Sequence, residues 1–391
     1  MGVSNTEMNL STDIARAPRP RGVRNVVVVT ALAVLAVMAR AHEVPSPHNV
    51  SVSDHLTLGL PMVNSVTDVE LAQLGKRLFS DVRLSVDGKV SCATCHVPKM
   101  SFSDHRARAA GRQQQLLTRN TPSLLNVVYL NSLFWDGRSS DLSAQAKVPL
   151  FGPLEHGLPD ERALSDIVSG DSAYVRAFGR AFQLSSTDRI GVREVVGALA
   201  AYENTLIAGG SSFDEFFYGR KHDAMTPAAV HGFELFRGRA GCASCHLVGQ
   251  RDALFTDQQF HIGPGGLGQR VTLHLAELTR RVAQLRHSGD LNELNRAVSK
   301  NTELAALGRF VVSLDPKDIG CFKTPSLRNV AMTAPYMHDG RVKTLEEAID
   351  LELYSRTEGV HRPIALTALE KRDLLEFLRA LTSPYAATST F

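Results

Sequence analysis

Two short stretches decide the organisation of the chain: Cys92-Ala93-Thr94-Cys95-His96 and Cys242-Ala243-Ser244-Cys245-His246. Each has the pattern CxxCH, in which two thiols on one turn can add to the vinyl groups of a haem while the adjacent imidazole binds its iron. A CxxC pair alone also fits a zinc site, a redox dithiol or a disulfide. The histidine in both copies favours two covalently bound c-type haems, with a paired Cys/His zinc site as the main alternative.

The composition is that of an ordinary globular protein. Of the 391 residues 43% are hydrophobic and 21% are charged, and the formal net charge is +3. A chain of this length can bury two hydrophobic cores. No basic stripe with interleaved aromatic residues is present, which argues against nucleic-acid binding.

Residues 1–41 have the pattern of a secretory signal peptide. Four arginines between positions 16 and 24 precede an apolar run over residues 26–39, and Ala39-Arg40-Ala41 has the small-x-small form of a cleavage site. The run is shorter than the roughly 18–20 residues of a stable membrane span. A cleaved signal is therefore favoured over an N-terminal anchor. We expect a periplasmic protein without a membrane span after signal removal.

The remaining sequence predicts a mainly α fold with long loops. Apolar residues recur at helical spacing, and Thr226-Pro227 and the Thr367/Glu370 pair have the spacing of helix starts. The chain also repeats itself: residues 121–127 (TPSLLNV) lead to WDGR, and residues 324–330 (TPSLRNV) lead to HDGR at the same spacing. We interpret this as two homologous cytochrome c-like haem domains, over residues 53–215 and 223–391, with a boundary near 208–223.

Two side chains distinguish the first half from the second. Trp135, the only tryptophan, stands where the second half has His338. It is either a core aromatic residue or an electron relay between the haems. Glu155 lies on an otherwise apolar stretch and is either a surface charge or the acid–base group that peroxide chemistry needs.

With these motifs, the sequence resembles the bacterial di-haem cytochrome c peroxidase/MauG family over essentially the whole chain after the signal. Members carry two CxxCH motifs, an FWDGR segment after the first and an LRNVxxTAPYMHDG segment after the second. Here these segments are residues 134–138 and 327–340.

The resemblance implies a role for each matching position. The haem on His96 would react with hydrogen peroxide, and His246 would hold the second haem, with Trp135 between the two. The pocket of the first haem would contain Glu155, Gln145 and Pro149. A calcium ion would bind the Asn120 side chain and the carbonyls of Thr333 and Pro335, since oxygen ligands suit that hard cation.

Departures from the classical peroxidases favour the MauG branch. Their iron-capping histidine in the first loop is matched by Arg112, and His105 is the only imidazole nearby. No methionine follows Met337, so the second haem cannot take one from that segment. MauG-type enzymes place a tyrosine there. Ungapped counting reaches Glu352, but a small insertion would give Tyr354, which we favour. Either anionic ligand would lower the potential of the second haem relative to methionine.

The primary hypothesis is a periplasmic MauG-type oxidoreductase that uses hydrogen peroxide to oxidise a partner protein by long-range electron transfer. The family suggests an amine dehydrogenase precursor, as in tryptophylquinone maturation during methylamine utilisation, although the tryptophan that MauG proteins carry before the second motif is Ala240 here. One alternative is a cytochrome c peroxidase fed by a small cytochrome or cupredoxin. Another is a non-catalytic di-haem electron carrier, in which His105 or His156 would fill the open iron position.

Overall fold

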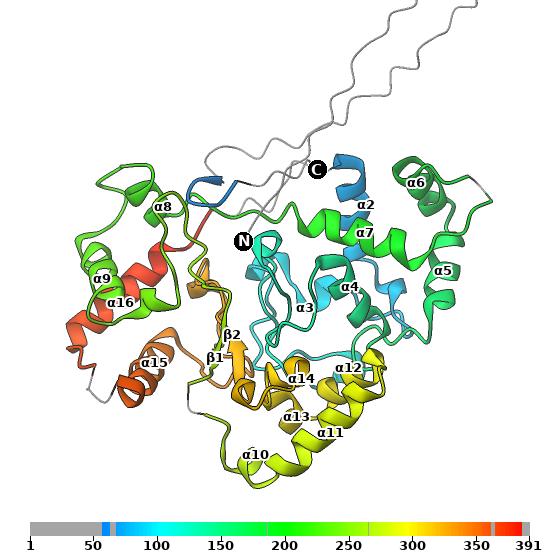
Figure 1. Ribbon diagram of the computed structural model, residues 1–391. Coiled ribbons are helices and arrows are strands. Elements are labelled where there is room, and N and C mark those ends of the chain that lie inside the picture. Colours follow the sequence, from blue (N-terminus) through cyan, green and yellow to red (C-terminus); the bar gives the residue numbers. More distant parts are fainter. Residues whose placement is uncertain (1–56, 63–67, 186, 265, 361–363, 385–391) are drawn as a thin grey trace, which may run out of the picture. The chain divides into compact units, whose positions relative to one another are not determined.

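The computed structural model describes residues 57–62, 68–185, 187–264, 266–360 and 364–384 (Figure 1). The predicted mainly α fold with long loops is confirmed. The described strands are β1 (Phe260–Ile262) and β2 (Cys321–Lys323), which pair antiparallel. The predicted signal peptide lies outside the described residues. Within the described ranges, no helix has the length and apolar character needed to cross a membrane.

The first hydrophobic core lies among five helices and contains Leu78, Phe79 and Phe178. The helices are α2 (Val69–Phe79), α4 (Leu142–Phe151), α5 (Glu161–Ser169), α6 (Ser172–Phe182) and α7 (Val192–Glu203). The CxxC turn of the first motif forms the short helix α3 (Cys92–Cys95) beside this core. Helix α2 packs along α7 (Figure 1), so the first motif follows directly from a fixed pair of helices.

The second core is built around Phe213, Phe236 and Phe377. Its helices are α8 (Ser212–Phe217), α9 (Pro227–Arg237), α15 (Leu345–Val360) and α16 (Ala368–Ala380). The two predicted helix starts are confirmed: the Thr226 side chain accepts the N–H of Ala229, and Thr367 forms a capping box with Glu370. Helix α9 packs along α16 as α2 packs along α7.

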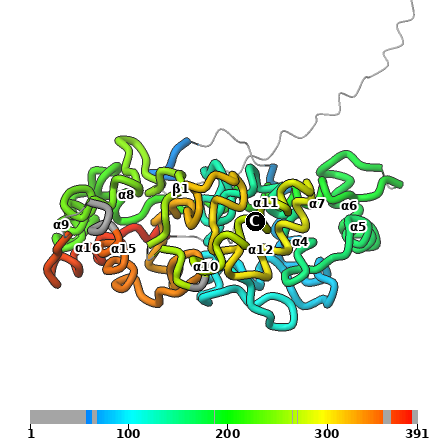
Figure 2. The backbone as a smooth tube through the Cα atoms, turned by 60° about the horizontal axis from the view of Figure 1, so that its bottom comes forward, coloured from blue at the N-terminus to red at the C-terminus, as the bar shows by residue number. Residues whose placement is uncertain are grey.

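A third cluster of helices was not anticipated from the sequence. It comprises α10 (Gln269–Leu273), α11 (Leu275–His287), α12 (Leu291–Lys300), α13 (Thr302–Ala306) and α14 (Phe310–Ser313), which bury a small core of their own. Figures 1 and 2 show α11 and α12 of this cluster close together. The cluster lies in the chain between the second motif and residues 324–330, where the first half has only a loop.

The loops contain seven described single-turn 3-10 helices. They are η1 (Val82–Leu84), η2 (Pro98–Met100), η3 (Arg112–Gln114), η4 (Val127–Tyr129), η5 (Cys242–Ser244), η6 (Pro316–Asp318) and η7 (Val330–Met332). Two of them, η4 and η7, follow the asparagines of the repeated segments, Asn126 and Asn329, which both have left-handed backbone conformations.

The repeat in the sequence is also a repeat of contacts. A Cβ added to Gly75 in α2 would lie 1.9 Å from the carbonyl oxygen of Ala198, and one added to Gly232 in α9 would lie 1.9 Å from that of Asp373. We call Gly75 and Gly232 the crossing glycines, because each lies where the two helices of its pair come closest. The two cores are therefore assembled by the same helix crossing, while the domain bounds 53–215 and 223–391 stay a prediction.

We expect Gly75→Ala to destabilise the protein by about 3 kcal/mol, because overpacking a tight contact forces the backbone apart. The matched control is Gly197→Ala in α7, where the nearest atom to an added Cβ is the Phe182 ring at 3.6 Å and alanine favours the helix. Chemical denaturation of the holoprotein measures both effects. Equal unfolding midpoints for the two variants would contradict the close helix crossing.

Candidate functional site

A single cavity of about 490 Å³ is lined by residues of both cores. The cysteines and histidines of both CxxCH motifs face it: Cys92, Cys95 and His96 from the first, and Cys242, Cys245 and His246 from the second. Most other lining residues are apolar, with a few charged side chains among them. An apolar enclosure with a small number of polar groups is typical of a cofactor site.

Both motif histidines are oriented by a backbone carbonyl. The Nδ1 atom of His96 lies 3.1 Å from the carbonyl oxygen of Phe102, and that of His246 lies 2.8 Å from the carbonyl oxygen of Phe255. An Nδ1–H that donates to a carbonyl leaves Nε2 as the metal-binding atom. Burial lowers the pKa of His96, which favours the neutral imidazole that iron requires. The donor set of each motif therefore fits a haem.

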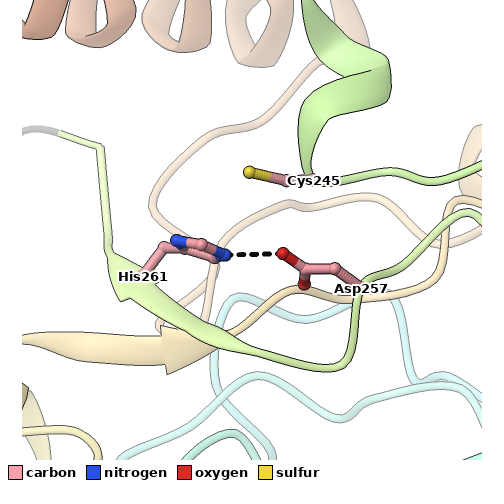
Figure 3. A group of neighbouring side chains, drawn as sticks. All are labelled: Cys245, Asp257 and His261. Atoms are coloured by element: carbon pink, nitrogen blue, oxygen red, sulfur yellow. Dashed lines mark hydrogen bonds and ion pairs between the residues drawn. The ribbon is translucent and has the colours of Figure 1, made fainter.

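The zinc alternative has no geometric support among the described residues. In that part of the chain, the one group of three or more possible metal ligands is Cys245, Asp257 and His261, whose ligand atoms lie within 4.8 Å of one another (Figure 3). Neither motif histidine belongs to it. The Nε2–H of His261 donates to the Asp257 carboxylate at 2.7 Å. Haem attachment would convert the Cys245 thiol into a thioether, so we assign this group to the edge of the second haem.

Helix α4 brings together the residues expected around the first haem. Leu142, Gln145, Ala146 and Pro149 line the cavity at the i, i+3, i+4, i+7 spacing of one helix face. Glu155, on the segment after this helix, lines it too. The loop is fixed by a hydrogen bond from the Glu155 N–H to the carbonyl of Gly152 (3.0 Å).

The Glu155 side chain is partly buried and faces the cavity, so it is not simply a surface charge. Burial raises its pKa, and the nearby Arg138 guanidinium opposes this increase. The other candidates for the first iron lie elsewhere: His105 is exposed and its Nε2 lies 2.8 Å from the carbonyl oxygen of Met332. His156 does line the cavity, but its Nδ1 lies 2.8 Å from the Leu84 carbonyl oxygen and its Nε2 faces the Cys92 sulfur at 3.8 Å.

Helix α15 lines the part of the cavity expected to hold the second haem, with residues at the same helical spacing as those of α4. Leu345, Ala348, Ile349 and Glu352 line the cavity, again at i, i+3, i+4, i+7. Tyr354 is absent from this lining and is 63% exposed, because two further residues turn a side chain by about 200° around a helix. The placement therefore speaks against our preference for Tyr354 and in favour of Glu352.

Trp135 lies where the two halves of the chain join. Its indole N–H donates to the carbonyl of Asn120 (3.0 Å), and the N–H of Lys323 donates to the Trp135 carbonyl (2.9 Å). The backbone N–H of Asn120 in turn donates to the carbonyl of His338 (2.9 Å). Trp135 and its counterpart His338 thus both line the cavity and are connected through Asn120.

The His338 ring is held neutral beside a buried cation. It stacks on Phe322 with ring centroids 3.7 Å apart, and its Nδ1 lies 2.9 Å from an Arg119 guanidinium nitrogen. Burial and the neighbouring Arg119 lower the pKa of His338 to about 2. A neutral imidazole accepting from Arg119 is the form that this geometry supports.

A buried charged cluster was missed by the sequence reading. Asp136 is fully buried and pairs with Arg138 at 2.8 Å and with Arg119 at 3.7 Å. Lys323 is also buried in the cavity wall, and burial lowers its pKa to about 8. The three cations exceed the one carboxylate, which suits the negatively charged propionate edge of a haem. The repeated DGR segment was the only sequence signal for this cluster.

The three predicted calcium ligands all belong to the cavity wall. Asn120, Thr333 and Pro335 all line it. The Asn120 side-chain nitrogen donates to the carbonyl of Arg106 (2.8 Å), which leaves its side-chain oxygen for other contacts. Calcium takes about six to eight oxygen ligands, so these residues could form only part of a site. Calcium stays a proposal.

Comparison with known proteins identifies relatives over most of the chain. The sequence model for the di-haem cytochrome c peroxidase family matches residues 69–222. The methylamine utilization protein MauG of Methylorubrum extorquens is 34% identical over 332 residues, which cover 84% of this chain and 82% of the relative. Cytochrome c551 peroxidase of Nitrosomonas europaea is 31% identical over 283 residues, or 72% of each chain.

Solved structures agree with these relatives. A MauG-like protein associated with microbial copper homeostasis matches with a TM-score of 0.67 and 29% identity, covering 88% of this chain and 97% of that one. The diheme peroxidase BthA of Burkholderia thailandensis matches with a TM-score of 0.61 and 25% identity, covering 81% and 87%. The resemblance predicted from the two motifs is therefore confirmed, and the family implies two haems. The chain belongs to the bacterial di-haem cytochrome c peroxidase/MauG family and is a peroxidase-type oxidoreductase.

Proposed function

We propose that this protein is a periplasmic MauG-type oxidoreductase, which uses hydrogen peroxide to oxidise a partner protein by long-range electron transfer. The observation that carries the proposal is the shared cavity: both motifs face it, with Glu155 on one side and Trp135 at the junction. The cysteine pairs Cys92/Cys95 and Cys242/Cys245 would attach the haems, and His96 and His246 would bind their irons. When bound, the haems supply the iron that exchanges electrons with peroxide and with the partner.

Glu155 is the acid–base group of the first haem pocket. A cavity-lining carboxyl with a raised pKa can accept a proton from one peroxide oxygen and return it to the other, which assists cleavage of the bond between them. Gln145 and Pro149 lie on the adjoining face of α4 and restrict the space in which peroxide can bind.

Trp135 provides the path between the two haem positions. Its backbone is held by Lys323 and its indole by the Asn120 carbonyl, so the ring has a fixed place in the wall shared by both halves. The partly buried aromatic ring lines the cavity and is the side chain best placed to share oxidising equivalents between the two sites.

Glu352 is the proposed distal ligand of the second haem, in place of Tyr354. It stands on the cavity face of α15 where the first half has Pro149 on α4. A carboxylate lowers the potential of an iron relative to a methionine ligand. This property favours retention of oxidising equivalents and so supports the MauG-type reaction over the ordinary peroxidase reaction.

The partner oxidised by this enzyme is proposed to be a periplasmic protein, with its tryptophan residues as the substrate. The MauG relative supports an amine dehydrogenase precursor. The alternative, a cytochrome c peroxidase fed by a small cytochrome or cupredoxin, is favoured by the peroxidase relative. Ala240 stands where MauG proteins carry a tryptophan on the electron path, but it is fully buried and has no aromatic ring. Electrons must therefore pass between the second haem and the partner protein by another route.

The test is the absorption and EPR spectrum of the oxidised holoprotein before and after one equivalent of hydrogen peroxide, with catalase-treated peroxide as the control. For a MauG-type enzyme we expect the fully oxidised protein to respond directly, with changes at both haems. A response that requires prior half-reduction would replace the proposal by the ordinary peroxidase. Two low-spin haems that ignore peroxide in either state would leave only an electron carrier.

A further inference from the structure

We propose that Glu203 couples reduction of the first haem to the uptake of a proton. When the iron accepts one electron from an external donor, the Glu203 carboxylate takes one proton from water and becomes the carboxylic acid; reoxidation releases both. Glu203 would tune the site and would not touch peroxide. The inference rests on the proposed attachment of the first haem at Cys92, Cys95 and His96.

Glu203 is placed inside the site without an evident structural role. It is the last residue of α7, is 4% exposed and lines the cavity. Its Oε2 atom is buried and has no hydrogen-bond partner within the described part of the chain. The carboxyl lies close enough to Cys92 to raise the pKa of that thiol, after the larger effect of burial. A buried carboxyl left in this condition costs stability, so a structural role does not explain it.

The internal repeat supplies a comparison within the same chain. Tyr202 packs against the crossing glycine of the first helix pair, and Phe377 packs against that of the second, with Cβ contacts of 2.8 and 2.9 Å. One residue further along each helix are Glu203 and Leu378, which therefore occupy equivalent positions. Leu378 is also buried and also lines the cavity. The fold thus accepts an apolar residue at this position, and of the two equivalent positions only the one in the first half carries a carboxyl.

The same equivalence holds beyond the end of the two helices. The N–H of Asn126 donates to the carbonyl of Leu206 (2.8 Å), and the N–H of Asn329 donates to that of Leu381 (3.1 Å). The side-chain oxygen of each asparagine also accepts a backbone N–H from two residues beyond that leucine. The donor is Ala208 in the first half and Ser383 in the second, and both distances are 2.8 Å. The register between α7 and α16 is therefore fixed on both sides of Glu203.

Electrostatics couples this carboxyl to a nearby iron. Burial raises the pKa of Glu203 to about 8, so the group can change its charge near neutral pH. A carboxylate in a low-dielectric site attracts the more positive, oxidised form of an iron. Adding an electron weakens that attraction and raises the proton affinity of the carboxyl further, so the electron and the proton enter together.

The cavity wall that holds Glu203 also carries the cations Arg119, Arg138 and Lys323, but none of them contributes to the pKa shift of Glu203. Glu203 acts on Cys92 and on Tyr202, and no charged neighbour contributes to its own pKa shift. Glu155 and the neutral His156 also line the cavity. Helices α2, α4 and α5 pack on α7, and besides Lys76 their ionic side chains form pairs at the surface: Arg77 with Asp171, Arg180 with Glu70, Lys147 with Glu161, and Arg162 with Asp166.

The test is a spectroelectrochemical titration of the first haem in the purified holoprotein at several pH values. In the unmodified protein we expect the equilibrium constant for reduction to fall by up to about tenfold per pH unit between the pKa of Glu203 in the oxidised protein and its higher pKa in the reduced protein, as for one proton taken up per electron. Glu203→Gln and Glu203→Leu should lose this dependence, and Glu203→Asp should retain it. Leu378→Gln, at the equivalent position, is the matched control and should leave the first haem's pH dependence intact.

Infrared difference spectra between the oxidised and reduced holoprotein give an independent readout that needs no stable variant. A carboxylic-acid band should appear on reduction and should shift when glutamate is ¹³C-labelled. A pH dependence that survives in Glu203→Gln, or a flat dependence with no such band in the unmodified protein, would overturn the inference. A normal peroxide response without pH dependence rejects this inference alone, whereas pH dependence without any peroxide response rejects the proposed function alone.

Discussion

Glu155→Gln is expected to slow the reaction of the oxidised holoprotein with hydrogen peroxide by about 10²–10⁴-fold, the usual contribution of a positioned acid–base group. Glutamine keeps the size of the side chain and its place behind α4 but cannot carry the proton between the two peroxide oxygens. Glu155 lines the cavity next to the face of α4 that carries Gln145 and Pro149, whereas Glu161 does not line it. Stopped-flow absorbance after mixing with peroxide measures the rate.

The matched control is Glu161→Gln. This glutamate lies nearby in the sequence, at the start of α5, but it is exposed and pairs with Lys147 outside the cavity. Its replacement should leave the peroxide rate at the unmodified value. If Glu155→Gln reacts as fast as this control, Glu155 has no part in proton transfer.

The reaction should also depend on pH through Glu155. The carboxylate is the form that accepts a proton from peroxide, and burial raises its pKa above that of an ordinary glutamate. The rate should therefore fall as the pH is lowered through this raised pKa, at a higher pH than for an exposed carboxyl. Glu155→Gln should lose this acidic limb of the profile, which separates a role in proton transfer from a purely steric one.

Much of the site could be predicted because its chemistry is local in sequence. The CxxCH spacing fixes thiols and imidazole on one turn, whatever the rest of the chain does. The repeated TPSL and DGR segments correctly predicted two similar halves, and the structure repeats their contacts, including the left-handed Asn126 and Asn329. The helix that carries Gln145 and Pro149 was not delimited from the sequence, yet both residues do lie at the cavity.

What escaped prediction depends on contacts between distant parts of the chain. Helices α11 to α13 have readable apolar spacing, but the sequence does not show that they lie against the first half. There, the Thr118 hydroxyl donates to the Val298 carbonyl (3.0 Å), and the Arg119 guanidinium donates to the Ala305 carbonyl. Nor does the sequence distinguish the buried Lys323 from any surface lysine. Burial of a charge is a property of the assembled fold, and composition does not encode it.

The choice between Glu352 and Tyr354 stays a prediction, but the helical pattern of the sequence already bears on which of the two faces the cavity. Leu345, Ala348 and Ile349 already mark one face of a helix, and the next position on that face is 352. The expected chemistry of a MauG-type ligand favours Tyr354, whereas helical periodicity favours Glu352. The structure shows an uninterrupted α15 through this region, so no insertion brings the tyrosine into register.

Glu352→Gln is therefore expected to change the EPR signal of the second haem, because its iron loses an anionic ligand, while Tyr354→Phe leaves the signal unchanged. The amide is a much poorer iron ligand than a carboxylate, whereas Tyr354 lies on the exposed side of α15. The two variants differ by two positions on one helix and are matched in size to the residues they replace. EPR spectra of the oxidised holoproteins, with the first haem as internal reference, measure the effect.

The opposite result, with the signal changed in Tyr354→Phe and kept in Glu352→Gln, would require α15 to shift its register when the haem is bound. The two outcomes also differ for the mechanism. Pro149 on α4 and Glu352 on α15 occupy equivalent positions of two equivalent helices, and both line the cavity. If Glu352 is the ligand, the second iron would have an anionic ligand at the position that proline leaves open at the first. A single substitution on a repeated scaffold would then separate the peroxide-binding site from the electron-storing site.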